Sequence, residues 1–209
     1  MLAARRAGEA GRRLLRAVIA SRAPATTLDD VAATLDAVAE QLEPYAVRSR
    51  YEGTAGLAVA SGGGIRDPRV LEHHLLLGEA NPLAPPLTID RSPEGHVRAL
   101  ATYDLRYEGM PGWVHGGAIA LAFDLVLGLA AGAIAHRPVM TGTLTLRYRK
   151  PSLLWTELVY EADAEPDGER KINASGTLRG PDGDVRVEAE GIWIRARTDN
   201  IPPAAGDVE

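Results

Sequence analysis

One apolar stretch begins with residues whose types and spacing could do chemistry together. His115 is followed by Gly116 and Gly117, and Asp124 lies nine residues after His115. Glycines at a helix N-terminus leave free backbone N–H groups open to a ligand oxygen, and the helix dipole favours negative charge there. A carboxylate can act as a general base, and an unpartnered one inside a core is costly. This set is suited to stabilising an oxyanion while activating a water molecule.

Each of these residues also has a structural interpretation. Asp124 could be a structural acid that pairs with an arginine such as Arg147 or caps a neighbouring segment, and His115 could be a buried histidine with satisfied hydrogen bonds. Competing catalytic patterns are absent from the sequence, which contains no GxSxG, no Walker loop and no HExxH. The chain has no cysteine, which excludes disulfides, zinc thiolate sites and a cysteine nucleophile.

The spacing has a consequence for assembly. Gly117 and Asp124 are about two helical turns apart, so they share a face but are separated by a rise of about 10 Å. A reacting carbonyl carbon must lie within roughly 3 Å of both groups. Two antiparallel copies of the helix, one from each subunit, satisfy this condition. The spacing therefore predicts a homo-oligomer with its site at a twofold interface.

The residues that carry this set form a long apolar helix. Residues 113–130 are apolar or small all round, which is typical of a helix buried in a core. A membrane span over 113–135 is the alternative, but Asp124 near its centre would cost about 2.5–3.5 kcal/mol on insertion scales. We therefore expect a core helix and no transmembrane segment.

Alternating apolar and polar residues predict strands before and after this helix. Short turns between them predict antiparallel pairing. One curved antiparallel sheet wrapped around the apolar helix would hide it, which gives an α+β fold. The predicted strands are 87–90, 96–106, 139–149, 158–164, 171–178 and 185–194.

The N-terminal part has a different character. Residues 2–20 are rich in arginine and suit an amphipathic helix packed on its own domain or on a partner; a transit peptide and a membrane-surface helix are the alternatives. Apolar residues from Leu28 to Leu42 recur at helical spacing, which predicts a second helix and a helical hairpin. We divide the chain into a helical extension, a linker, a main domain and a disordered tail, at 1–44, 45–79, 80–197 and 198–209.

Composition limits the classes of function. The formal net charge of −5 gives no indication of nucleic-acid binding. Nearly all basic residues are arginine, and with abundant Ala and Gly this is typical of a GC-rich bacterial coding bias. The N-terminus lacks the long apolar run of a secretory signal. We expect a cytoplasmic protein.

Several short motifs together resemble one family. The segment 108–117 and the later Asp124 are similar to the PaaI-like branch of the hotdog-fold acyl-CoA thioesterases. The resemblance covers residues 80–195 and implies a hotdog fold. The later motifs that share it are Met140-Thr141, Tyr148-Arg149-Lys150-Pro151 and Gly168-Glu169-Arg170-Lys171.

The resemblance implies roles for individual residues. Asp124 would be the catalytic carboxylate, Gly117 or Gly116 would supply the oxyanion N–H, and His115 would shape their loop. Thr141 resembles the Ser or Thr that holds the water, although it could simply be a residue of high β-propensity. Relatives often carry an Asn or Gln before the HGG, whereas this chain has Gly109-Met110-Pro111. The oxyanion site would then rest on backbone N–H groups and on His115.

The resemblance also implies a substrate. We expect hydrolysis of an acyl-CoA thioester, or of a thioester on a carrier protein, with no metal or redox cofactor and with coenzyme A as part of the substrate. We expect at least a homodimer, with a homotetramer as the alternative. Basic side chains could meet the phosphates of coenzyme A or form a solvated rim: Arg149, Lys150, Arg170 and Lys171. The alternative function is a non-catalytic acyl-ligand binding or assembly module of the same fold.

Overall fold

The main domain is one antiparallel sheet of six strands. The computed structural model describes residues 2–49, 71–72, 74–85 and 87–196. The strands lie in the order β1-β2-β4-β5-β6-β3, so β1 and β3 are the two edges. Their bounds are β1 (Leu87–Arg91), β2 (Val97–Thr102), β3 (Val139–Tyr148), β4 (Glu157–Asp167), β5 (Lys171–Arg179) and β6 (Val185–Arg195).

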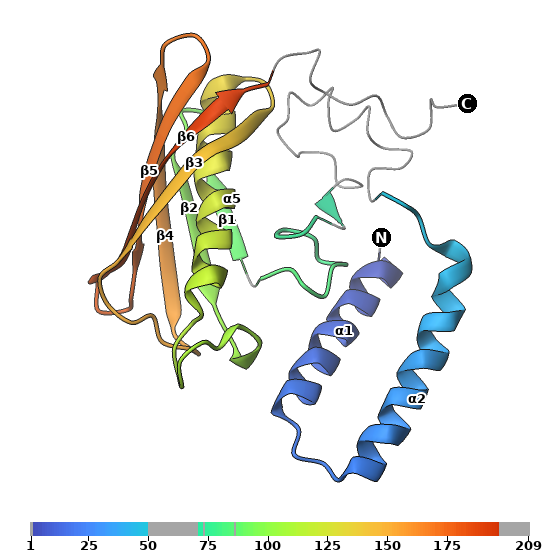
Figure 1. Ribbon diagram of the computed structural model, residues 1–209. Helices are drawn as coiled ribbons and strands as arrows, with labels where there is room; N and C mark the ends of the chain where they lie inside the picture. Colours follow the sequence, from blue (N-terminus) through green and yellow to red (C-terminus); the bar gives the residue numbers. More distant parts are fainter. Residues whose placement is uncertain (1, 50–70, 73, 86, 197–209) are drawn as a thin grey trace, which may run out of the picture.

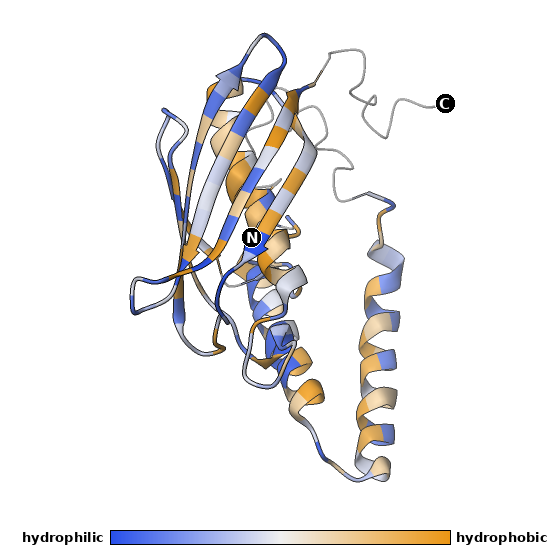
Figure 2. Cartoon of the chain, turned by 60° about the vertical axis from the view of Figure 1, so that its left-hand side comes forward, coloured by the Kyte–Doolittle hydropathy of each residue, from blue (hydrophilic) through white to orange (hydrophobic). Residues whose placement is uncertain are grey.

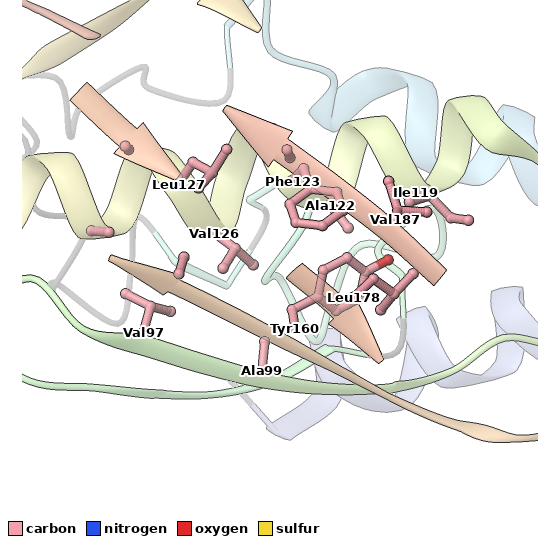
Figure 3. Packing of buried hydrophobic residues seen from close by; sticks show 14 of the residues in the cluster. Val97, Ala99, Ile119, Ala122, Phe123, Val126, Leu127, Tyr160, Leu178 and Val187 are labelled. Atoms are coloured by element: carbon pink, nitrogen blue, oxygen red, sulfur yellow. The ribbon is translucent and has the colours of Figure 1, made fainter. Parts of the chain in front are cut away.

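A single long helix, α5 (Gly116–Ala135), lies against the inner face of this sheet (Figure 1). Its buried residues meet inward-facing residues of the strands. Phe123 packs edge-on against Tyr160 of β4, with ring centroids 5.0 Å apart (Figure 3). The Tyr160 hydroxyl in turn shares a buried 2.8 Å hydrogen bond with Tyr103. The predicted α+β hotdog architecture is confirmed.

By length and composition α5 could also cross a membrane. Half of that apolar window is buried inside the protein, in contact with the sheet. Core helices commonly satisfy the same criterion. The polar residue that interrupts this helix, Asp124, faces the strand β3.

The second predicted strand is shorter than expected. Strand β2 ends at Thr102, whereas the alternation predicted a strand to residue 106. The reason is Asp104, whose side chain accepts the backbone N–H of Arg106 and begins the helical turn η2 (Leu105–Tyr107). The apolar residues at 103 and 105 continue the period of a strand, but the local side-chain cap redirects the backbone.

The helix α1 (Leu2–Ala20) packs on the main domain. Its buried residue Gly8 lies so close to residues 79 and 80 that a Cβ there would be 2.6–2.7 Å from their backbone atoms. Arg12 donates to the carbonyls of Glu79 and Asn81 at 2.9 and 3.0 Å. Arg16 lies 3.5 Å from the buried carboxylate of Asp104. The predicted amphipathic helix therefore has a partner within its own chain.

The helix α2 (Ala25–Leu42), followed by the turn η1 (Glu43–Tyr45), runs antiparallel to α1 after a short connection, as the predicted hairpin requires, but it does not pack closely against α1. It contains no buried residue, and Figures 1 and 2 show it standing apart from α1. Three of its stripe residues, Leu28, Val38 and Leu42, are 42%, 49% and 65% exposed. Apolar periodicity predicted the helix, but it could not predict which surface, if any, would cover the stripe.

Part of the predicted linker is ordered. Residues 74–79 include the buried Leu76 and form backbone hydrogen bonds up to Ala80 and Asn81. Residues 50–70 of the predicted linker and the predicted tail, 198–209, lie outside the described residues.

Candidate functional site

The start of α5 is built around His115, which is the N-cap of the helix. Its backbone is extended, with φ −60° and ψ 132°, and its ring nitrogen Nδ1 accepts the Gly117 N–H at 2.9 Å. A ring nitrogen that accepts a hydrogen bond must offer a lone pair, so this bond is made by the tautomer of His115 that carries its proton on Nε2. The Gly117 N–H is therefore already occupied by the protein itself.

The next free donor is the backbone of Gly116. Its N–H has no hydrogen-bond acceptor among the described residues, and the residue is half-buried. The first N–H groups of a helix have no partner within the helix, so a ligand oxygen can take their place. Of the two glycines named from the sequence, the structure leaves Gly116 as the open donor.

The groove in front of this helix end runs between the loop 108–110, the start of α5 and residues 148–152. It has a volume of about 770 Å³ and an apolar lining that includes Met110, Trp113 and Ile119. The Tyr148 hydroxyl donates to the Gly116 carbonyl at 2.7 Å. Ser152 also borders the groove, and its buried hydroxyl has no hydrogen-bond partner in the described part of the chain.

The carboxylate of Asp124 has a hydroxyl partner. Thr141 Oγ1 donates to Asp124 Oδ1 at 2.7 Å, and Asp124 is half-buried. Thr141 stands beside a shift in the register of β3 against β6, which lies between Thr141 and Thr143. Arg147, the suggested ion-pair partner, instead lies 3.8 Å from Glu190. Asp124 is therefore hydrogen-bonded but not paired with a cation among the described residues.

The site residues form two separate groups in one chain. His115 and Gly116 lie with Tyr148 near the last residue of β3, whereas Asp124 lies with Thr141 near its start. Gly116 and Asp124 are eight residues apart on one helix, which is a rise of about 12 Å. A single carbonyl group cannot touch both within one chain.

The four basic residues are divided in the same way. Arg149 follows β3 and pairs with Glu188 at 2.8 Å, and Lys150 pairs with Asp184. Lys171 begins β5 opposite Ile194, which in turn lies opposite Met140 at the start of β3. At about 3.3 Å per residue the two basic pairs lie roughly 25–30 Å apart along the sheet. One chain does not bring these cations together.

Sequence reasoning did not assign roles to Tyr148 and Ser152. The sequence marks Tyr148 only as the first residue of the motif Tyr148-Arg149-Lys150-Pro151, because a tyrosine that ends an alternating strand normally indicates packing. Partial burial raises the pKa of its hydroxyl above the ordinary value. Nothing in the sequence around Ser152 indicated that its hydroxyl would be buried beside the helix N-terminus.

Comparison with known proteins identifies the family. The crystal structure of the thioesterase superfamily protein RHA08564 is 32% identical, covers 91% of this chain and 94% of its own, and superposes with a TM-score of 0.73. No family model matches. The fold and the site define a hotdog protein with an HGG helix N-terminus and a carboxylate on the helix. The chain belongs to the thioesterase superfamily, and the predicted resemblance to PaaI-like hotdog thioesterases is confirmed at that level.

Curated relatives match over a shorter segment. Acyl-coenzyme A thioesterase THEM4 of Rattus norvegicus is 33% identical over 107 residues, which is 51% of this chain and 46% of the rat protein. The Mus musculus THEM4 is 34% identical over 92 residues, which is 44% of this chain and 39% of the mouse protein. The match thus spans less than half the length of these relatives. The structure of smu.793 from Streptococcus mutans bound to acetyl CoA shares the fold, at 18% identity over 53% of this chain and 88% of its own, with a TM-score of 0.50.

Proposed function

We propose that this chain hydrolyses acyl thioesters of coenzyme A or of a carrier protein, with Asp124 as the general base. The observation that carries the proposal is the hydrogen bond from Thr141 to Asp124, a half-buried carboxylate that has no cation partner among the described residues. One carboxylate oxygen is held by Thr141, and the other is available to a water molecule. The family membership and the names of the THEM4 relatives support the same chemistry.

The electrophile would be activated at the other end of the helix. The Gly116 N–H, at the positive end of the α5 dipole, would donate to the thioester carbonyl oxygen as that oxygen gains negative charge. Water adds to the carbonyl carbon while Asp124 removes its proton. The C–S bond then breaks, and the proton passes to the leaving thiolate, which gives a carboxylic acid and a free thiol.

A second copy of the chain would complete the site. The rise of about 12 Å between Gly116 and Asp124 requires that they come from different chains. The strand β3 supports this arrangement because it is a sheet edge of ten residues with mostly exposed side chains, and such an edge favours pairing with another chain. We therefore propose a dimer in which Gly116 of one chain faces Asp124 of the other.

The same dimer would gather the basic residues. In an antiparallel arrangement, the end of β3 in one copy lies near the start of β3 in the other. Arg149 and Lys150 of one chain would then approach Arg170 and Lys171 of its partner, at a site suited to the phosphates of coenzyme A. Arg170 and Lys171 form no ion pair with any described residue, so their charges remain available.

A non-catalytic binding module is the second candidate function. It is favoured by the loop 108–112, where no amide side chain faces the helix end and the Glu108 carboxylate is used to hold the Gly112 N–H at 2.6 Å. Such a protein would bind an acyl thioester through the groove and the Gly116 N–H without turnover. The half-buried carboxylate of Asp124, which has no cation partner among the described residues, argues for the enzyme.

The test is a panel of short, long and aromatic acyl-CoAs with a reagent that detects free thiol. The parent should release thiol steadily from at least one substrate. The variant Asp124→Asn keeps the side-chain shape and should lose at least about a hundredfold in turnover, in line with general-base contributions. Tight binding without thiol release would support the binding module, and an amide variant as active as the parent would exclude Asp124 from the reaction.

A further inference from the structure

The Gly116–Gly117 peptide group is held at both ends by side chains. Its carbonyl oxygen, on Gly116, accepts the Tyr148 hydroxyl at 2.7 Å. Its N–H, on Gly117, is donated to His115 Nδ1 at 2.9 Å. The two holding side chains come from different elements, since Tyr148 ends β3 and His115 precedes α5. One rigid peptide plane is thus fixed between the sheet and the helix cap.

The Tyr148 hydrogen bond is not needed to satisfy the helix. A carbonyl in the first turn of an α-helix accepts the N–H four residues later, and it has a second lone pair to spare. The bond to Tyr148 therefore adds a constraint to a group that the helix already satisfies. Its effect is to fix the orientation of the turn from which the Gly116 N–H projects.

The two aromatic rings lie close to both glycines. A Cβ on Gly116 would lie 3.3 Å from Cζ and Oη of Tyr148, and a Cβ on Gly117 would lie 3.0 Å from His115 Nδ1. Each glycine thus makes room for the ring that holds the peptide. A Cβ at either position would require the facing ring to shift by a few tenths of an ångström.

We propose that Tyr148 is a positioning residue, whose hydroxyl fixes the Gly116–Gly117 peptide and thereby aims the Gly116 N–H at the substrate carbonyl. This inference rests on the proposed thioester hydrolysis. It identifies the side chain that holds the proposed oxyanion donor in place. Tyr148 acts through the backbone and makes no contact with the reacting atoms. A tyrosine hydroxyl has an ordinary pKa of about 10 and is therefore protonated, and able to donate, across the neutral range.

The test compares two phenylalanine variants of the full chain. Tyr148→Phe removes only the hydroxyl at the helix end. Tyr107→Phe is the matched control, because the Tyr107 hydroxyl also donates to a backbone carbonyl, that of Ala84 at 3.2 Å. Steady-state kinetics on an acyl-CoA substrate would give kcat and KM, and NMR hydrogen exchange would report the protection of the Gly117 amide independently of activity.

A positioning role predicts that Tyr148→Phe lowers kcat about 5- to 10-fold with KM changed less than about twofold, since the interaction matters in the transition state. The Gly117 amide should exchange at least about threefold faster, while core amides such as that of Val126 keep their protection. Tyr107→Phe should change neither quantity.

Every other outcome has a defined meaning. If Tyr148→Phe matches Tyr107→Phe in both kcat and Gly117 exchange, the positioning role is wrong. A change confined to KM, or a loss of kcat with unchanged exchange, would show that the hydroxyl contacts the substrate directly and would also overturn it. If the parent hydrolyses no thioester, the proposed function fails, and the exchange measurement alone decides whether Tyr148 holds the peptide.

Discussion

Replacing Gly116 with proline would remove the proposed oxyanion donor while keeping the helix. Gly116 is the first residue of α5, the position at which proline is best tolerated, because its missing N–H has no helical partner there. The residue before a proline must be extended, and His115 already has φ −60° and ψ 132°. The substitution should therefore delete one N–H with little cost in stability.

The expected loss is that of a single oxyanion donor. Removing one such donor typically costs roughly 3–4 kcal/mol, which corresponds to about 10²–10³ in kcat. Gly116→Ala is the matched control, because it keeps the N–H and introduces a Cβ at the same place, 3.3 Å from the Tyr148 ring. The difference between the two variants isolates the N–H from the crowding caused by the Cβ.

The assay is steady-state thiol release from the best acyl-CoA of the panel, with thermal unfolding of both variants as a check on folding. Gly116→Pro should be at least about a hundredfold below Gly116→Ala in kcat. If both variants fold and have equal kcat, the Gly116 N–H does not stabilise the oxyanion. The donor would then have to be the Gly117 N–H, which donates to His115 in the structure.

Two further predictions concern stability. Gly8→Ala should destabilise the protein by about 1–3 kcal/mol, because its Cβ would lie 2.6–2.7 Å from backbone atoms. The control is Gly132→Ala in α5, where the nearest atom to the added Cβ would be 4.0 Å away, and it should stabilise the protein by up to ~1 kcal/mol. Equal shifts in melting temperature for the two variants would mean that α1 does not pack as described. Burial raises the pKa of Asp104, but the hydrogen bonds and charge of Arg106, with Arg16 nearby, outweigh burial and hold that pKa below its ordinary value. Asp104 should therefore stabilise the parent over Asp104→Asn at pH 7, by about 2 kcal/mol in urea unfolding, and the advantage should begin to shrink as the pH falls below about 4 and be lost as the pH falls through the lowered pKa of the folded state. An advantage that is as large at pH 2 as at pH 7 would contradict the ion pairing.

Much of the fold could be predicted because it depends on local patterns. The apolar circumference of α5 and the alternation of the strands are properties of consecutive residues, and both were enough to place the helix inside an antiparallel sheet. The errors occur where a single polar side chain redirects the backbone, as Asp104 does after β2. Periodicity also predicted the apolar stripe of α2 without identifying a surface that would cover it.

The site was predictable only in part, for the same reason. His115 and Asp124 lie on one helix, so their spacing gives their separation directly. That His115 occupies the Gly117 N–H, and leaves the Gly116 N–H open, depends on a side-chain rotamer that no spacing specifies. Tyr148 reaches Gly116 from 32 residues away, through the pairing of β3 with the rest of the sheet. Such contacts follow from tertiary structure alone.

The central claim is a thioesterase site shared by two subunits. Complementation between two inactive variants tests this claim most directly. An Asp124→Asn chain and a Gly116→Pro chain should each be nearly inactive alone. In a mixed dimer, one site combines the intact Gly116 of the first chain with the intact Asp124 of the second, and the other site carries both lesions. Because random pairing makes half of the dimers mixed, co-refolded chains should regain up to about a quarter of parental thiol release. If mixed dimers form and no activity returns, the two groups act within one chain, and the shared site is wrong.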